Sequence, residues 1–313
     1  MIINGYAYPT IRDEVLEDWL KVIDCISTFS YGMTSEGSLI NLNDEKLVEG
    51  AKKAGVGSLM VLTALGEDGQ FSSELVGTVL KDPGVQHRLI GDILLNIQEK
   101  GMTGIDFDFE YVFPENKDDY VELVRKTAEI LNPKGYLVTV ALAPKTSTDQ
   151  KGLLYEGHDY KGMGLAANYV LLMTYEWGYT YGPPMAVAPM NKVRQVLDYG
   201  VTQIQPSKIL MGIPNYGYDW KLPFVKGASK AEKVTNGEAV ARAQRMGVEI
   251  QFDPVAMSPY YFYTKPIEGS NPPAYEDHEV WFEDRRSLEA KLALVPQYGL
   301  AGISIWNIMY PYF

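Results

Sequence analysis

The stretch Tyr169-Val170-Leu171-Leu172-Met173 is a continuous run of apolar residues. A strand with this pattern is buried on both faces, which is typical of a parallel sheet covered by helices. Similar short β-rich runs recur along the chain, and most of them precede a helix-like stretch. The predicted strands cover residues 2–6, 25–30, 58–63, 104–111, 136–142, 169–175, 208–213 and 301–306.

The alternation of strands and helices predicts the architecture. Parallel strands need helical crossovers, and helix-like stretches cover residues 14–22, 45–54, 74–80, 86–100, 119–131, 162–167 and 192–199. Eight such units in 313 residues favour an α/β fold of the closed (β/α)8 TIM barrel type over an open doubly wound sheet. No Gly-x-Gly-x-x-Gly follows the first predicted strand, which argues against a dinucleotide-binding fold.

The interval between the seventh and eighth predicted strands is far longer than an ordinary βα connection. Its last part, residues 285–297, is predicted to be a barrel helix. The preceding part mixes a helical stretch, 237–246, with strand-like stretches at 248–252, 260–263 and 279–282. We therefore expect a barrel made of residues 1–217 and 285–313, and a small α+β insertion at 218–284. Because barrel active sites lie at the C-terminal mouth, the insertion is expected to form one wall of the cleft.

The composition limits the classes of partner. The chain has 28 Lys+Arg and 40 Asp+Glu, a net charge of −12, which argues against nucleic acid or an anionic membrane as the main partner. No apolar stretch is long enough to span a bilayer. The N-terminus lacks the pattern of a signal peptide, as expected for a cytoplasmic protein or for a chain trimmed of a leader or of an N-terminal module. Its single cysteine excludes an intrachain disulfide framework.

The fourth predicted strand carries the side chains that indicate chemistry. Its sequence, Gly104-Ile105-Asp106-Phe107-Asp108-Phe109-Glu110-Tyr111, alternates strictly between acidic and apolar residues. On a strand, Asp106, Asp108 and Glu110 would share one face, with Glu110 nearest the mouth of a barrel. Carboxyl groups crowded in a low-dielectric interior have pKa values that are forced apart. One group then stays protonated as an acid beside an ionised neighbour.

An edge strand that faces solvent and a calcium site are the alternatives for these acidic residues. The segment, however, lies in the middle of an α/β alternation, and it lacks the glycine-containing loop of an EF-hand. The dispersed histidines His87, His158 and His278 form no zinc-binding pair. No Gly-x-Ser-x-Gly elbow is present for a serine hydrolase. The sequence thus implies no metal and no cofactor.

These residues resemble the Asp-x-x-Asp-x-Asp-x-Glu signature of family 18 glycoside hydrolases, the chitinase-like barrels. The outermost Asp is absent, since Thr103 stands at or beside its place. Met173-Thr174-Tyr175-Glu176 resembles the sixth-strand Met-x-Tyr-Asp, and Gly212-Ile213-Pro214-Asn215-Tyr216-Gly217 resembles the seventh-strand Gly-x-Pro-x-Tyr-Gly. Gly302-Ile303-Ser304-Ile305-Trp306 resembles the eighth-strand segment whose Trp floors the sugar site. The details are most similar to the spore-associated branch, the YaaH-like N-acetylglucosaminidases.

The resemblance implies a retaining mechanism in which the 2-acetamido group of the substrate is the nucleophile. Glu110 would be the acid and base, Asp108 would orient the acetamido group, Asp106 would share a proton with Asp108, and Tyr175 would hold the acetamido oxygen. The implied substrate-binding residues are Trp306, Glu176, Tyr6, Phe29, Tyr216 and Met173. Core packing accounts for Phe29 equally well. Glu176 replaces an Asp and is one methylene longer, so a structural salt bridge is an equal alternative to sugar contact.

The implied substrate is a β-1,4-linked polymer that contains N-acetylglucosamine, such as peptidoglycan or spore-cortex fragments. Cleavage is expected after N-acetylglucosamine, because many muramic residues of cortex are lactams that lack the acetamido nucleophile. A chitinase, an endo-β-N-acetylglucosaminidase and a non-catalytic chitinase-like lectin are the alternatives. The resemblance places the protein at the spore or cell wall, while the sequence leaves its oligomeric state and exo or endo action open.

Overall fold

The computed structural model describes residues 1–312, which divide into two compact units. The first unit consists of residues 1–173, 196–212 and 295–309. The second consists of residues 174–195 and 213–294, together with the chain from Tyr310 onward. The insertion expected at 218–284 lies entirely within this second unit. Strand β8 (Ile209–Pro214) and helix α8 (Met190–Gln203) each continue from one unit into the other.

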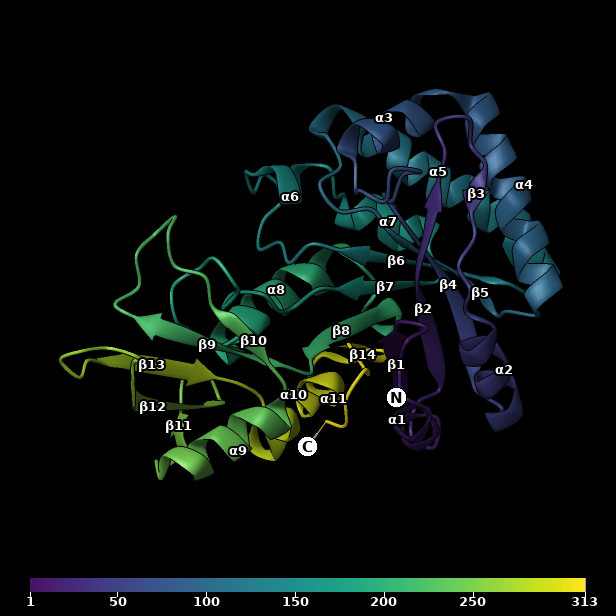
Figure 1. The fold of residues 1–313 in the computed structure, drawn as a ribbon. Coiled ribbons are helices and arrows are strands. Elements are labelled where there is room, and N and C mark those ends of the chain that lie inside the picture. Colours follow the sequence, from purple (N-terminus) through teal and green to yellow (C-terminus); the bar gives the residue numbers. More distant parts are fainter. Residues whose placement is uncertain (313) are drawn as a thin grey trace. The chain divides into compact units, whose positions relative to one another are not determined.

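Eight parallel strands close into a barrel, which confirms the predicted (β/α)8 TIM barrel. They are β1 (Ile2–Ala7), β2 (Cys25–Met33), β4 (Gly57–Thr63), β5 (Gly104–Asp108), β6 (Leu137–Leu142), β7 (Tyr169–Leu172), β8 and β14 (Gly302–Trp306). Their order is β1-β14-β8-β7-β6-β5-β4-β2, and β2 pairs with β1 to complete the circle (Figure 1). A short strand that the sequence did not predict, β3 (Leu39–Ile40), pairs antiparallel with β2.

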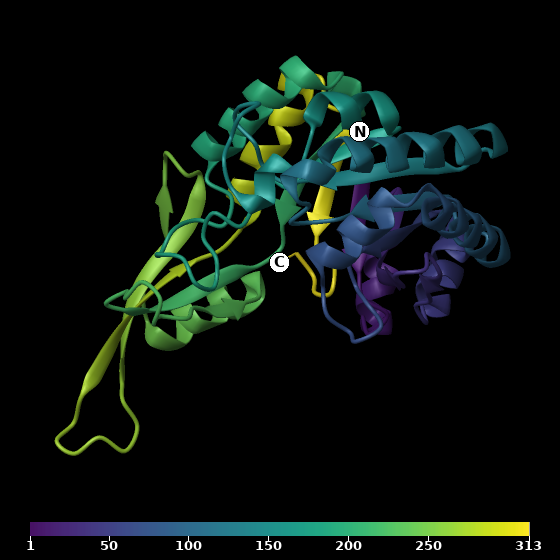
Figure 2. The same ribbon diagram turned by 90° about the horizontal axis from the view of Figure 1, so that it is seen from above.

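Helices follow most of the barrel strands and flank them in the view of Figure 2. They are α1 (Asp13–Trp19), α2 (Glu45–Ala54), α3 (Ser73–Lys81), α4 (Pro83–Lys100), α5 (Lys117–Leu131), α6 (Leu153–Glu156) and α7 (Tyr160–Ala166), with single 3-10 turns at Pro114–Asn116, Asn132–Lys134 and Pro206–Lys208. Local sequence sets their ends. The Asp82 side chain accepts the first free N–H groups of α4, and Gly101 ends that helix in the left-handed conformation.

Strand β5 is buried along its whole length, at the acidic as well as the apolar positions. Ile105 and Phe107 are fully buried, while the acidic residues of the opposite parity are 2% exposed at Asp106 and 9% exposed at Asp108. The strand ends at Asp108, so the prediction that it runs to residue 111 is wrong. At Tyr111 φ is 52°, in the left-handed region, and a strand cannot continue through that conformation.

The second unit is built on an antiparallel sheet with the order β10-β9-β13-β12-β11. Its elements are β9 (Gly217–Leu222), β10 (Glu232–Val234), α9 (Asn236–Met246), β11 (Gln251–Asp253), β12 (Ser258–Pro266), β13 (Tyr275–Trp281) and α10 (Arg285–Leu292), followed by α11 (Leu294–Tyr298). Tyr261, Tyr263 and Val280 of the sheet share a small core with Ala239 and Ala243 of α9. The α+β composition expected for this region is thus present.

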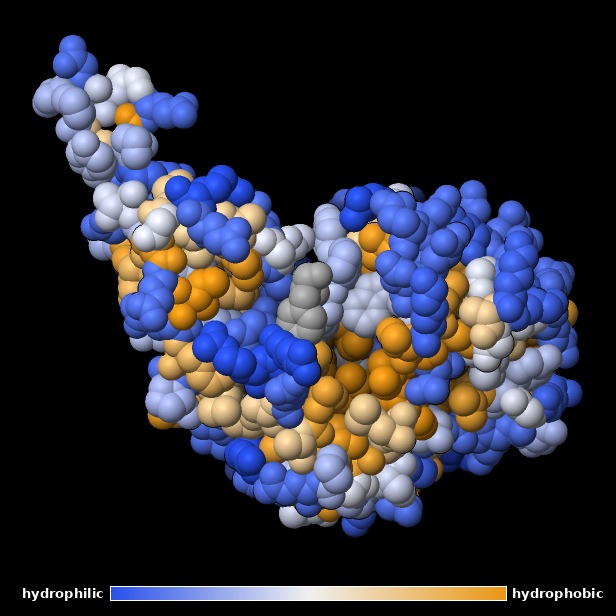
Figure 3. Space-filling model, turned by 90° about the horizontal axis from the view of Figure 1, so that it is seen from below, coloured by the Kyte–Doolittle hydropathy of each residue, from blue (hydrophilic) through white to orange (hydrophobic). Residues whose placement is uncertain are grey.

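Several large hydrophobic side chains are exposed, among them Phe71, Leu165 and Tyr275. On the face drawn in Figure 3, hydrophobic residues are exposed in several places among hydrophilic ones. Among residues 1–312, no helix combines the length and the apolar character that a membrane-spanning segment requires.

Candidate active site

Asp106 lies in the middle of β5 and is held from both sides of the barrel. Its Oδ2 accepts a hydrogen bond of 2.5 Å from the hydroxyl of Tyr6 on β1. Its Oδ1 accepts one from the hydroxyl of Thr139 on β6. Burial raises the pKa of Asp106 to about 6, and the two hydrogen bonds oppose that rise. Thr139 was not predicted, although it is the one polar residue in the apolar run Leu137–Leu142.

Asp108, the last residue of β5, is buried with one oxygen unsatisfied. Its Oδ1 has no hydrogen-bond partner within residues 1–312. Burial raises the pKa of Asp108 well above its usual value, and the charges of Glu110 and Asp106 raise it further. A buried polar atom without a partner is costly and points to a ligand or a proton that completes it. The protonation of Asp108 therefore depends on the charges of both neighbours.

Glu110 lies just beyond the C-terminal end of β5 and is exposed. The C-terminal ends of the barrel strands lie at one mouth of the barrel, where the βα loops meet. Substrates bind at this mouth in proteins of this fold. Phe109, which separates Glu110 from the strand, is fully buried. The alternation of faces therefore continues past the end of β5, and it leaves an accessible carboxyl group next to two buried ones.

Aromatic side chains gather where β1 and β14 end, together with Phe29 from the middle of β2. Trp306, the last residue of β14, lies with its ring centroid 4.9 Å from that of Phe29, 5.6 Å from that of Tyr6 and 6.1 Å from that of Tyr8. Phe29 is half-buried, and its ring packs edge-on against that of Trp306. Tyr8 was not predicted, although it follows Tyr6 at the spacing that returns to the same face of a strand. Met173 is buried, and its N–H donates to the Leu142 carbonyl.

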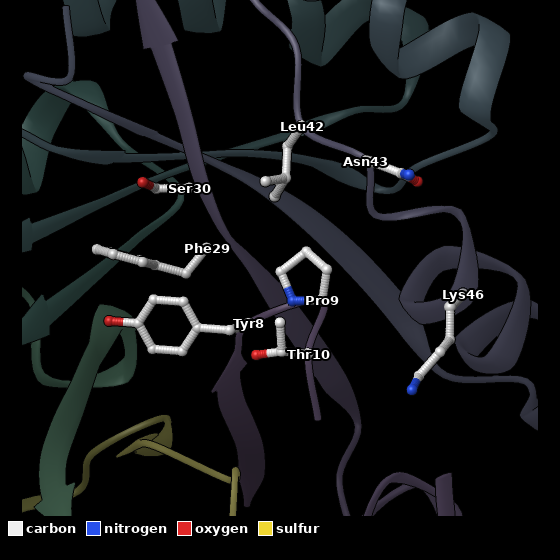
Figure 4. Close-up of a pocket in the computed structure, with 8 residues that line it drawn as sticks. All are labelled: Tyr8, Pro9, Thr10, Phe29, Ser30, Leu42, Asn43 and Lys46. Carbon is white, nitrogen blue, oxygen red and sulfur yellow. The ribbon is translucent and has the colours of Figure 1, made fainter. Parts of the chain in front are cut away.

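A pocket of about 670 Å³ opens beside this aromatic cluster. Its lining residues are Tyr8, Pro9, Thr10, Phe29, Ser30, Leu42, Asn43 and Lys46. Figure 4 shows the rings of Tyr8 and Phe29 next to each other on one side and Lys46 on the other. Burial raises the pKa of Tyr8, and the charge of Asp108 adds to that rise, so the pocket lies within electrostatic reach of the acidic group.

The remaining predicted site residues belong to the second unit. The Glu176 carboxylate accepts hydrogen bonds from the hydroxyls of Tyr216 and Tyr218, the latter at 3.1 Å. Glu176 adopts φ of 66°, a left-handed conformation that costs free energy and recurs at functional sites. Lys233 lies 3.7 Å from the ring centroid of Tyr216. Tyr175 is buried beside Glu176 in sequence. Tyrosine hydroxyls thus hold Glu176, where the sequence had suggested a salt bridge as one alternative.

The acidic side chains of the first unit are arranged for proton transfer. An exposed carboxyl can exchange protons with a bound molecule. The two buried neighbours have raised pKa values, so they can gain or lose a proton and thereby change the charge beside it. Aromatic rings with polar edges, such as those of Tyr8 and Trp306, suit stacking on sugar faces. Within residues 1–312, no cluster of three or more His, Cys, Asp or Glu side chains could hold a metal ion.

Comparison with known proteins places these features in a family. Residues 24–310 match the family described as glycosyl hydrolases family 18. The chain is 38% identical over 290 residues to the cortical fragment-lytic enzyme of Bacillus anthracis. The aligned region covers 92% of this chain and 65% of that protein. It is 33% identical over 301 residues to the putative sporulation-specific glycosylase YdhD of Bacillus subtilis, covering 96% of this chain and 69% of the relative.

Solved structures agree with the sequence matches. The crystal structure of the Bacillus cereus spore cortex-lytic enzyme SleL matches with a TM-score of 0.92 and 36% identity, covering 99% of this chain and 71% of that one. The chain spans about 65% of the length of the cortical fragment-lytic relative from Bacillus anthracis. The match to the family extends over almost the whole barrel and the second unit. The chain belongs to family 18 of the glycosyl hydrolases.

Proposed function

We propose that this protein is a retaining glycosidase that cleaves β-1,4 bonds after N-acetylglucosamine in a cell-wall polymer, either peptidoglycan or spore-cortex fragments. Membership of family 18 supports hydrolysis of a glycan, and the names of the relatives from Bacillus support cortex as the polymer and the spore as the place of action. The observation that carries the proposal is the acidic group on β5, in which exposed Glu110 follows buried Asp106 and Asp108.

In the proposed reaction the Glu110 carboxyl gives its proton to the glycosidic oxygen as the C1–O bond breaks. The carbonyl oxygen of the substrate's acetamido group forms a bond to C1 on the opposite face, which produces an oxazolinium ion. Water then attacks C1, the oxazolinium ring opens, and the Glu110 carboxylate accepts the proton of the water. Two inversions at C1 give net retention.

The buried pair has a separate role in this proposal. Asp108 Oδ1 would accept the acetamido N–H, which supplies the partner that this oxygen otherwise lacks. A negative Asp108 would also stabilise the positive oxazolinium ion, and its charge matters more because the site is desolvated. Asp106 would take up the proton that leaves Asp108, and the hydroxyls of Tyr6 and Thr139 would favour its return because they stabilise the ionised form of Asp106.

Sugar binding is assigned to the aromatic residues. Trp306 would form the floor of the site, with Tyr6, Phe29 and Tyr8 beside it, and the pocket next to Tyr8 has room for a further sugar ring. We also propose that Tyr175 holds the acetamido oxygen in attack geometry and that Glu176 and Tyr216 contact the sugar. The hydrogen bond between Glu176 and Tyr216 supports a joint role for these two residues.

The decisive experiment replaces the proposed acid. Glu110→Gln should lower kcat on purified cortex fragments by about 100-fold or more, because general acid catalysis typically contributes that much. Glu115→Gln is the matched control, since Glu115 is exposed in the 3-10 turn Pro114–Asn116 and should leave the rate unchanged. Equal and slow sugar release by wild type and Glu110→Gln, with binding intact, would instead indicate a lectin.

Product analysis tests the substrate and the stereochemistry. Mass spectrometry of fragments released from cortex should find N-acetylglucosamine at the new reducing end, and proton NMR should detect the β-anomer first. Faster release from chitin oligomers than from cortex fragments would favour a chitinase. Comparable hydrolysis of a substrate that lacks the 2-acetamido group would contradict the substrate-assisted mechanism.

A further inference from the structure

The backbone around Glu110 is held by side chains that no role assigned so far explains. Strand β5 pairs with its neighbours as far as Phe107 on the β6 side and Asp108 on the β4 side. The polar backbone groups of Phe109 lie beyond this ladder. The Phe109 N–H donates to the hydroxyl of Tyr120 on α5 at 3.5 Å, and the Phe109 carbonyl lies 2.9 Å from Nε2 of His158.

The protonation of His158 follows from its partners. The N–H of Ala143, which comes directly after β6, donates to Nδ1 of His158 at 2.9 Å. Nδ1 therefore carries no proton, and Nε2 carries the proton that it donates to the Phe109 carbonyl. His158 is completely buried, and burial lowers its pKa to about 4. The ring is thus neutral near pH 7 and links the ends of β5 and β6.

The loop that carries His158 is itself fixed. The His158 carbonyl accepts a hydrogen bond of 2.8 Å from Nζ of Lys145, which is buried. The hydroxyl of Tyr160 donates to the Ala143 carbonyl at 2.7 Å and accepts from the Lys145 N–H at 2.8 Å. These bonds tie the start of α7 to the segment after β6, so the imidazole is presented in one orientation.

The same loop also touches the chain on the other side of Glu110. A Cβ added at Gly157 would lie 2.2 Å from the carbonyl oxygen of Val112, so only glycine permits this approach. Gly157 and His158 therefore contact the backbone that follows Glu110 and the backbone that precedes it. Tyr111, between Glu110 and Val112, has the left-handed φ that turns the chain at this point.

From this geometry we infer that His158 is a positioning residue, which holds the Phe109 carbonyl so that the carboxyl group of Glu110 is aimed at the bond to be cleaved. The inference rests on the proposed function, in which Glu110 is the acid. General acid catalysis needs the carboxyl within hydrogen-bond reach of the leaving oxygen. A displacement of about 1 Å can lower a rate by about 100-fold.

The test compares two amide replacements that remove the same ring. His158→Gln retains an N–H donor near the position of Nε2, whereas His158→Asn cannot reach the Phe109 carbonyl. On an N-acetylglucosamine oligosaccharide, His158→Asn should lower kcat by about 10- to 100-fold with KM changed less than about 3-fold. His158→Gln should stay within about 3-fold of wild type. His87→Asn, at an exposed position on α4, is the control and should change neither constant.

A second substrate separates positioning from loss of folded protein. A 2,4-dinitrophenyl N-acetylglucosaminide releases a phenolate that needs no proton, so a misplaced acid should slow its cleavage step far less than that of the oligosaccharide. A fall in both rates by the same factor would indicate a purely structural role and overturn the inference. Tyr120→Phe removes the acceptor of the Phe109 N–H. It should also slow cleavage of the oligosaccharide more than that of the dinitrophenyl substrate, but to a smaller degree. This variant replaces His158→Asn in the test if His158→Asn does not fold.

Failure of the inference and failure of the proposed function give different results. If Glu110→Gln abolishes oligosaccharide cleavage while His158→Asn matches wild type, His158 has no positioning role and the acid assignment stands. If Glu110→Gln leaves oligosaccharide cleavage intact, the proposed function itself is wrong, whatever His158→Asn does.

Discussion

The hydroxyl of Tyr6 donates a hydrogen bond of 2.5 Å to Asp106, a residue one hundred positions later in the chain. Barrel closure makes this contact, because β1 and β5 are separated in the sheet order but both point side chains into the interior. The hydrogen bond stabilises the ionised form of Asp106, so it opposes the effect of burial on the pKa of that carboxyl. The Tyr6 hydroxyl therefore lowers the pKa of a carboxyl group on a strand that is not adjacent to its own in the sheet.

Tyr6→Phe should raise the pKa of Asp106 above about 6, since it removes a hydrogen bond that favours the ionised form. The acidic limb of the pH profile of kcat should then move to higher pH by about one unit, the equivalent of roughly 1.4 kcal/mol. Tyr298→Phe is the matched control, because Tyr298 donates at 2.7 Å to exposed Asp198. An acidic limb at the same pH in all three proteins would show that Tyr6 does not tune Asp106.

Asp106→Asn should stabilise the folded protein at neutral pH while it lowers activity. The folded-state pKa of Asp106 is about 6, against an ordinary value of 3.8, so the folded protein holds a proton that the unfolded chain has lost. Wild-type stability therefore falls as pH rises through this window. Between pH 3.5 and pH 7, the free energy of unfolding of Asp106→Asn should gain roughly 3 kcal/mol over wild type.

Urea unfolding at the two pH values measures this difference for Asp106→Asn. Asp118→Asn is the control, since the Asp118 side chain is 91% exposed and should show no such gain. A difference between Asp106→Asn and wild type that does not depend on pH would mean that Asp106 has no raised pKa in the folded protein.

Tyr8→Ala should weaken substrate binding, because it removes the ring that joins the aromatic cluster to the pocket. We expect KM for an oligosaccharide to rise about 10-fold, equivalent to roughly 1.4 kcal/mol, with kcat changed little. Tyr8→Phe keeps the ring and should stay close to wild type. Steady-state kinetics on oligosaccharides of increasing length would reveal the effect, and an unchanged KM at every length would exclude the pocket from substrate binding.

Asp219→Asn should destabilise the second unit strongly. The Asp219 side chain is 1% exposed and forms an ion pair with Arg242, accepts 2.6 Å from the Tyr263 hydroxyl and lies 2.6 Å from Nδ1 of His278. Breaking a buried pair leaves an uncompensated charge, which typically costs about 3–5 kcal/mol.

Thermal and urea unfolding measure the cost of Asp219→Asn. The control is Glu232→Gln, which removes another partner of the same Arg242 from a side chain that is 63% exposed. That change should cost at most about 1 kcal/mol. Equal effects of the two substitutions would contradict the importance of burial for the pair.

Local pattern was sufficient for much of the fold. Helix α2 occupies the predicted residues, and the barrel strands start within a residue of their predicted positions, because apolar runs and helix-ending glycines are local signals. The alternation of Asp106 and Asp108 with Ile105 and Phe107 predicts opposite faces for the acidic and the apolar side chains, and Asp106 does reach the hydroxyls of Tyr6 and Thr139 on two other barrel strands.

The end of β5 shows where local pattern fails. The alternation of residues 104–111 continues to Glu110, yet the strand ends at Asp108. The backbone N–H and C=O of Phe109 form hydrogen bonds with side chains instead of with a neighbouring strand. The partners are Tyr120 of α5 and His158 of the loop before α7. No local signal connects them to Phe109.

The sequence by itself determined the order of strands and helices, the acidic face of β5 and the resemblance to a family. Only the tertiary structure decided which partners hold this segment: Tyr6 and Thr139 at Asp106, and His158 at the carbonyl of Phe109, which precedes Glu110. The physical reason is range. Side-chain direction follows from neighbouring residues, whereas hydrogen-bond partners and burial, which set the pKa values, depend on closing the barrel over long separations in the chain.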